Sequence, residues 1–125
     1  MSFAVIPGST VANKGVCAYK RELAVTVSIV LGAAAGAYGT QVQAGQILTQ
    51  QSDGTYLPAA SGDAVTIGQT KILVQSVTVD GANPTPGLAG YVAGYFNIPA
   101  LIGSTAQIAA LGPVVEPGVL VMKQW

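Results

Sequence analysis

The sequence predicts a mainly β domain with one short helix, a small β-sandwich or β-tulip-like fold preceded by an extended N-terminal arm. Three observations predict this class. The 16 glycines and seven prolines favour many turns, several stretches place large side chains at every second position, and one segment has a helix-capping signature. At 125 residues the chain has the length of a single domain, which we place at residues 20–125.

The arm is predicted at residues 1–19, which lack a sustained period and contain breaker clusters at 7–9 and 13–15. Its apolar patch consists of Phe3, Ala4, Val5 and Ile6. An apolar segment of this kind can add a strand to the sheet edge of another chain, so we expect it to contact a partner. The alternative is a chain terminus without a binding role.

Residues 23–31 are predicted to form a long, half-buried strand, because large aliphatic side chains occupy every second position. The side chains expected on its buried face are Leu23, Val25, Val27, Ile29 and Leu31. A membrane or export segment over residues 20–37 is the alternative, since a basic pair precedes the apolar run. The run is shorter than the roughly 20 residues that cross a bilayer, so the strand is favoured.

A hairpin is predicted around Asp53 and Gly54, because this pair lies between the β-type runs 47–50 and 56–57. Residues 71–79 are rich in β-branched side chains and are expected to form a central strand.

Two prolines at 84 and 86 predict that residues 83–87 form a connection without regular strand pairing. The following segment, residues 90–98, is apolar on both faces and is expected to be a strand buried between the core and a partner. The candidate residues for the interface with that partner are Tyr91, Tyr95, Phe96 and the C-terminal Trp125.

The helix is predicted to begin at Ser104, which forms an S-x-x-Q capping box with Gln107. Gly112 and Pro113 end it after about two turns. Residues 119–122 are expected to form the last strand.

Half of the residues are hydrophobic and only 8% are charged, against about 25% in an ordinary soluble domain. Five basic and five acidic residues give a net charge of zero, so electrostatic repulsion between copies is small. We therefore expect an assembly to cover much of the surface. The basic residues form no stripe, which argues against a nucleic-acid partner.

The residue types also argue against an active site. The chain has no histidine, the commonest general base and metal ligand, and its single cysteine, Cys17, cannot form an intrachain disulfide. Cys17 is expected to be a small apolar filler. Asp53, Asp63 and Asp80 lie beside glycines in predicted turns, where Asp accepts backbone hydrogen bonds. We expect no enzyme activity, no metal site and no cofactor.

Four stretches carry a family resemblance through their order and spacing. They are GTQVQAGQIL at 39–48 with DGTYLP at 53–58, KILVQSV at 71–77, YVAGYFN at 91–97, and AQIAALG at 106–112 with PGVLV at 117–121. In this order they resemble the first hairpin, the central strand, the strand before the helix, and the closing helix and strand of the head decoration proteins of lambda-like tailed phages.

The resemblance implies a protein made in the bacterial cytoplasm that caps the outer surface of the expanded virion head as a homotrimer. Its partner would be the major capsid protein, which it would stabilise against the pressure of packaged DNA. No enzyme activity, direct nucleic-acid contact or membrane contact is implied. The resemblance also implies that the arm pairs with capsid strands, which makes Phe3, Ala4, Val5 and Ile6 candidate capsid contacts.

One segment departs from the family pattern: the strand at 23–31 is longer and more aliphatic. Either the arm ends near Tyr19, or this strand itself belongs to the capsid or trimer interface. Two other interpretations stay open. One is a different virion subunit, such as a tail-tube or head-completion protein. The other is an exported or membrane-anchored small protein that uses residues 20–37.

Overall fold

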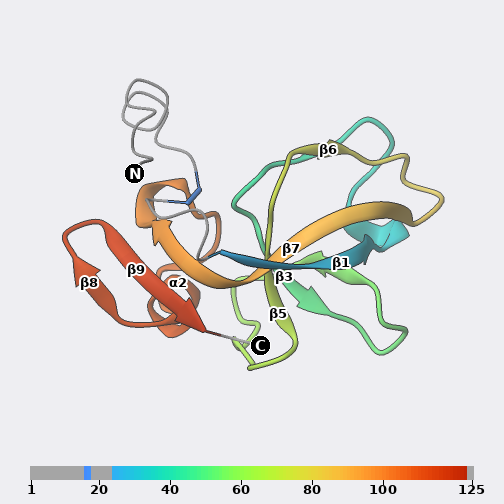
Figure 1. Cartoon of the computed structure of the whole chain (residues 1–125). Coiled ribbons are helices and arrows are strands. Elements are labelled where there is room, and N and C mark those ends of the chain that lie inside the picture. Colours follow the sequence, from blue (N-terminus) through green and yellow to red (C-terminus); the bar gives the residue numbers. More distant parts are fainter. Residues whose placement is uncertain (1–15, 18–23, 124–125) are drawn as a thin grey trace, which may run out of the picture.

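The computed structural model describes residues 16–17 and 24–123 (Figure 1). Its strands are β1 (Val25–Leu31), β2 (Gln41–Val42), β3 (Ile47–Gln50), β4 (Tyr56–Pro58), β5 (Thr70–Leu73), β6 (Val77–Thr78), β7 (Thr85–Asn97), β8 (Val114–Glu116) and β9 (Val119–Lys123). The helical elements of the same part are the 3-10 turns η3 (Ala33–Ala35) and η4 (Ile98–Ala100) and the α-helix α2 (Thr105–Leu111). The predicted class, mainly β with one short helix, is confirmed.

The main sheet closes on itself. Its seven strands follow the order β1-β4-β3-β5-β7-β9-β8, and β1 also pairs with β7. The strands β1, β4, β3, β5 and β7 therefore form a small barrel, while β9 and β8 continue the sheet beyond it. Strands β2 and β6 form a separate two-stranded sheet. Closure removes most of the open edges that an isolated small sheet would present.

The 13-residue strand β7 joins the barrel to the extension, and Figure 1 shows it crossing most of the molecule. Its first part is antiparallel to β1, its middle pairs with β5, and its last five residues, from Ala93 to Asn97, pair with β9. One strand thus belongs to both parts of the sheet, so neither part can form without it.

The prediction that residues 83–87 lack regular pairing is wrong from Thr85 onward, because Thr85 already pairs with Leu31 of β1. A shift of register accommodates the proline within this stretch. Ile29 pairs with Leu88 and Leu31 pairs with Thr85, so two residues of chain on β1 lie opposite three on β7. Gly87, with a φ of 79°, lies within this bulge. A bulge tolerates the missing proline N–H donor that a regular ladder would need.

The predicted central strand at 71–79 is two strands. β5 is central, between β3 and β7, but it ends at Leu73, and β6 belongs to the other sheet. Between them the hydroxyl of Ser76 accepts a hydrogen bond from the amide of Ala44, at 3.0 Å. This side chain thereby competes with ladder pairing at the point where the chain bends.

Two hydrophobic clusters lie on opposite faces of the barrel wall. The inner cluster draws on all five barrel strands, and the outer cluster lies under α2 and the β9 extension. The inner members are Ile29, Leu31, Val42, Leu48, Tyr56, Leu73, Val79 and Leu88. The outer members are Cys17, Ile47, Ile72, Phe96, Leu101, Leu111, Leu120 and Met122. Adjacent residues such as Ile72 and Leu73 enter different clusters, as the two-residue period of a strand requires.

The capping box at Ser104 is confirmed. The Gln107 amide donates to the Ser104 hydroxyl at 3.2 Å, and the Ser104 amide donates to the Gln107 side-chain oxygen at 2.9 Å. The Gln107 side-chain nitrogen also donates to the carbonyl oxygens of Ala60 and Asp63. This buried side chain therefore caps the helix and fastens the 60–63 turn to it, a second role that the sequence did not predict.

The described end of the predicted arm is anchored to β7. Cys17 forms an antiparallel bridge with Phe96, and the Asn97 amide donates to the Val16 carbonyl at 2.9 Å. Cys17 is buried within the outer cluster, which confirms its predicted role as a small apolar filler. The rest of the arm, and the candidate contacts Phe3, Ala4, Val5 and Ile6, lie outside the described residues.

Two glycines test the packing of this fold as a matched pair. Gly45 and Gly54 have similar positive φ values, 94° and 89°, but a Cβ atom at Gly45 would collide with the Ala100 carbonyl, whereas one at Gly54 would meet nothing within 4 Å. We expect Gly54→Ala to lower the free energy of unfolding by about 1 to 2 kcal/mol through backbone strain. Gly45→Ala should cost at least about 2 kcal/mol more, because η4 must move. Urea unfolding of the two variants measures this difference, and equal midpoints would contradict the Gly45–η4 contact.

Candidate functional site

The aspartate carboxylates in the described loops accept hydrogen bonds from residues of the same turn. Asp53 accepts hydrogen bonds from the Thr55 hydroxyl at 2.7 Å and its amide at 3.0 Å, and Asp80 accepts from the Ala82 and Asn83 amides at 2.6 and 2.8 Å. Asp63 accepts from the Ala60 amide at 2.9 Å. These contacts agree with the turn roles predicted from the sequence.

Residues 16–17 and 24–123 contain no group of three or more His, Cys, Asp or Glu side chains placed to hold a metal ion. Within the same residues, no helix has both the length and the apolar character needed to cross a bilayer.

Among the described charged residues, Lys71 is the buried one, with 5% of its surface exposed. Its ammonium group donates to the Gly68 carbonyl at 2.9 Å and lies 5.4 Å from the centre of the Tyr56 ring. A cation over an aromatic face recovers part of the free energy lost on desolvation. Lys71 packs against Gly90: a Cβ atom added to Gly90 would lie 2.9 Å from the Cβ atom of Lys71. We assign it a structural role inside the barrel.

The open part of β1 is the first candidate binding surface. On one side β1 pairs with β7 from Val25 to Leu31, but on its other side the described residues provide one partner, Tyr56, opposite Leu31. Its first four residues are all exposed, so both faces of the strand are open there. We call residues 25–28 with their unpaired backbone the β1 edge.

The β1 edge corrects the sequence analysis, which placed Val25 and Val27 on a buried face with Ile29 and Leu31. Val25 and Val27 are 43% and 40% exposed, whereas Ile29 and Leu31 are buried. The alternation predicted the shared face, but burial also needs a neighbouring strand. Because β4 is three residues long and starts opposite Leu31, nothing in the described chain covers the preceding residues. Leu23 lies outside the described residues.

The second candidate surface is the hairpin of β8 and β9, which ends the sheet. β8 is exposed along its whole length, and Val114 and Val115 are 61% and 47% exposed. A shallow apolar groove of about 240 Å³ separates this hairpin from α2. Its lining residues are Ile98, Thr105, Ile108, Ala109, Val114 and Leu120.

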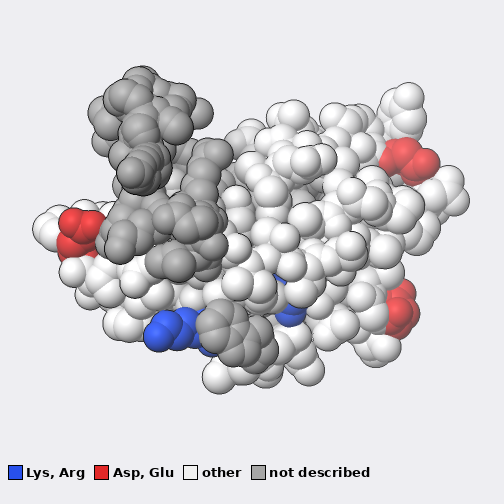
Figure 2. Space-filling model, viewed as in Figure 1, with Lys and Arg blue, Asp and Glu red and all other residues white. Residues whose placement is uncertain are grey.

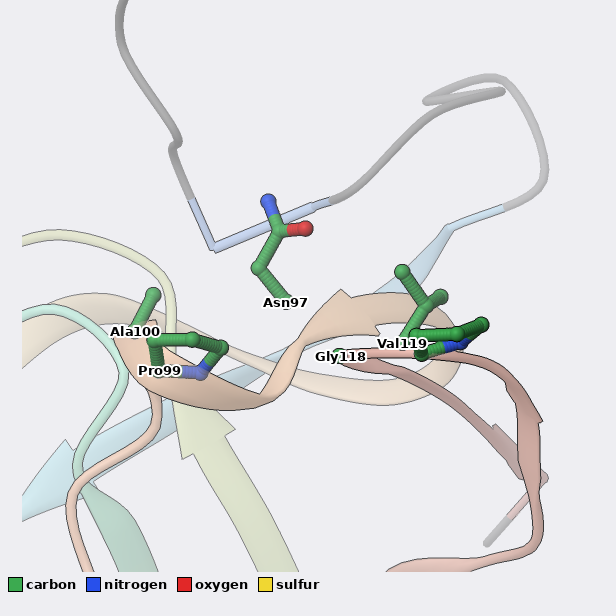
Figure 3. A pocket seen from close by; sticks show the side chains of 6 residues that line it. Asn97, Pro99, Ala100, Gly118 and Val119 are labelled. Carbon is green, nitrogen blue, oxygen red and sulfur yellow. The ribbon is translucent and has the colours of Figure 1, made fainter.

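A second groove, of about 250 Å³, lies between η4 and the turn that joins β8 to β9. We call it the η4 groove; its lining residues are Asn97, Pro99, Ala100, Pro117, Gly118 and Val119. Figure 3 shows Pro99 and Ala100 on one side of it and Gly118 and Val119 on the other. The Asn97 side chain stands between them and points toward the light blue trace of residues 16–17.

Charge is scarce on the visible surface. Figure 2 shows a face that is mostly neither acidic nor basic, with acidic groups at its ends and basic groups along its lower part. The described charged residues are Asp53, Asp63, Lys71, Asp80, Glu116 and Lys123. The exposed large hydrophobic side chains are Val25, Val27, Tyr38, Ile67, Ile102, Val114 and Val115. Uncharged surface with exposed valines on open strands is typical of a protein-binding face.

The predicted interface residues differ in how far the structure buries them. Tyr91 and Tyr95 are half-buried on β7, while Phe96 is fully buried and its ring packs edge-on against Tyr91 at 5.1 Å between ring centres. The prediction of Phe96 as an interface residue is wrong, because its ring has no surface left for a partner. Trp125 lies outside the described residues.

The chain was also compared with known proteins. No protein-family model, curated protein or solved structure matches it.

The turn carboxylates generate a prediction about acid stability. Hydrogen bonds from the Thr55 hydroxyl and amide lower the pKa of Asp53, and those from the Ala82 and Asn83 amides lower the pKa of Asp80. A folded-state pKa below the unfolded value of about 3.9 stabilises the fold above that pH, and this stabilisation is lost as the pH falls through the folded-state pKa.

We therefore expect a chain with both Asp53→Asn and Asp80→Asn to lose less stability than the natural chain between about pH 5 and pH 2. Urea midpoints at several pH values in this window measure the effect. If the variant lost stability on acidification as steeply as the natural chain, the turn hydrogen bonds would not be the cause.

Proposed function

We propose that this protein is a phage capsid decoration protein, a structural subunit that binds the outside of the expanded head as a homotrimer and strengthens it. The observation that carries the docking role is the β1 edge, an uncharged strand with one side unpaired in the described chain. The resemblance of residues 39–122 to decoration proteins supports the major capsid protein as the partner.

The β1 edge is suited to pairing with a strand of another protein. Unpaired N–H and C=O groups along an edge strand accept an added strand, and alternate side chains then determine which partner fits. Val25 and Val27 provide an apolar face for such a partner, and residues 25–31 contain no charge that would oppose it. Natural edge strands commonly carry lysine or proline that blocks such pairing, and this one carries neither.

The low charge of the chain supports the same proposal. A decoration protein buries surface against the shell and against its own copies, so its solubility as a lone domain matters less than complementarity. Contacts that are weak individually become strong when a closed shell repeats them and each trimer engages several sites at once. In this proposal the protein has no enzymatic role and needs no cofactor, nucleic acid or membrane.

The proposal is tested by sedimenting purified protein with expanded capsids that lack decoration. We expect binding to saturate near one copy per capsid subunit, since a trimer at each three-fold position supplies three copies to three subunits. Binding at a dozen or fewer positions per capsid would instead indicate a tail-associated or head-completion subunit. Absence of binding would overturn the proposal.

The β1 edge is tested by a chain with Val25→Lys and Val27→Lys, compared with Ile67→Lys, which alters a side chain that is 72% exposed in the loop before β5. We expect the β1 variant to weaken capsid binding at least about tenfold, because two valines no longer bury against the partner. Both variants should unfold within a few degrees of the natural chain, since exposed positions contribute little to stability. Equal capsid binding by the two variants would show that β1 is not the docking edge.

A further inference from the structure

We propose that the apolar segment at residues 3–6 of this chain packs into the η4 groove of the same molecule when the protein is free. The occupant is therefore part of the chain itself, and the site is the hollow between η4 and the β8–β9 turn. This inference goes beyond capsid binding and does not depend on it.

The groove offers an apolar surface with little competing chemistry. Two prolines, Pro99 and Pro117, line it together with Ala100 and Val119, and Asn97 contributes a polar side chain (Figure 3). None of the described lining residues is charged. Apolar side chains that enter such a site gain free energy in proportion to the apolar area removed from water.

The path of the chain leads toward this groove. Cys17 faces Phe96 in an antiparallel bridge, and the Val16 carbonyl accepts from the Asn97 amide. Because the two segments run antiparallel, Val16 lies on the η4 side of Cys17, beside Asn97. The same Val16 side chain approaches Gly45, the residue that abuts the η4 carbonyl of Ala100.

The tether is long enough for the segment to return to the groove. Nine residues, 7–15, separate Ile6 from Val16, and they span at most about 30 Å when extended. One end of the groove is Asn97, whose amide is hydrogen-bonded to the Val16 carbonyl. The other end is Val119, which pairs with Asn97 across β7 and β9. Neighbouring strands lie about 5 Å apart, so the reach exceeds the width to be crossed several-fold.

The segment matches the groove in chemistry. Phe3, Ala4, Val5 and Ile6 form the longest uninterrupted apolar run before Val16, and none of them carries charge. A short tether holds the segment at an effective concentration in the millimolar range, so even weak affinity keeps the groove occupied. Docking in this way shields a phenylalanine and an isoleucine that would otherwise expose apolar surface in the free protein.

The test uses nuclear magnetic resonance on the full-length free protein with a nitroxide attached to a Ser2→Cys variant. Cys17 is buried, and natural chain treated with the same reagent controls for label at that residue. We expect paramagnetic broadening of the Ala100, Gly118 and Val119 amides. The Thr85 amide, at the other end of β7 and at most about 40 Å away, should be unaffected.

Two further samples decide whether residues 3–6 are responsible and whether docking is within one molecule. Adding Phe3→Asp and Ile6→Asp should reduce the broadening about tenfold or more, whereas Val11→Asp, the matched control in the tether, should leave it unchanged. The second sample mixes nitroxide-bearing chain at natural isotope abundance with ¹⁵N-enriched chain that carries no nitroxide. The groove amides of the ¹⁵N-enriched chain should show no broadening.

Three results would overturn the inference: broadening spread evenly over the domain, broadening insensitive to Phe3→Asp with Ile6→Asp, or full broadening in the mixed sample. The last result would assign the groove to the segment of a neighbouring copy. None of these results bears on capsid sedimentation, so the inference and the proposed function fail separately.

Discussion

The pairing of β1 with β7 is the contact on which the rest of the structure depends. It closes the five-stranded ring around the inner cluster and anchors the long strand that continues into β9 and β8. Without closure, β1 and β7 would each present a long open edge, and Ile29 and Leu88, which face each other across the pair, would lose their burial. The bulge at Pro86 and Gly87 lets this pairing run to the end of the barrel despite two prolines nearby.

Lys71 and Gln107 are buried polar side chains whose hydrogen-bond partners lie close by. The Lys71 ammonium group donates to the Gly68 carbonyl and lies over the Tyr56 ring. The Gln107 side chain caps α2 through its oxygen and binds the 60–63 turn through its nitrogen. Burying such groups without partners would cost several kcal/mol. The small number of charges agrees with a core that fills both faces of the barrel wall and with the uncharged outer surface that the proposed docking role needs.

The exposed valines of the described chain lie where strands end or extend beyond their neighbours. The β1 edge exists because β4 is parallel to β1 and begins only opposite Leu31, and β8 is exposed because it is the last strand of the extension. The η4 groove lies at the other end of β7, beside the point where the N-terminal chain joins the fold. The proposed partner surface and the proposed self-docking site are therefore separate features on one continuous sheet.

Local patterns in the sequence determined the class of the fold, the β3–β4 turn at Asp53 and Gly54, the boundaries of α2, and the turn roles of the aspartates. These features depend on residues within a few positions of one another, through capping, turn hydrogen bonds and strand alternation. Alternation also placed Val25, Val27, Ile29 and Leu31 on one face of a strand. What it could not determine was burial, because burial depends on the length and register of β4, which lies 25 residues further along the chain.

Tertiary structure alone decided the closure of the barrel, the division of the predicted 71–79 strand between two sheets, and the burial of Lys71 and Phe96. Each of these outcomes depends on contacts between segments far apart in sequence, such as Ser76 with Ala44 or Phe96 with Cys17. Phe96 shows the reason most clearly. Its pattern of neighbours suits an interface and a core equally well, and only the arrival of Cys17 and α2 on its face of β7 makes it part of the core.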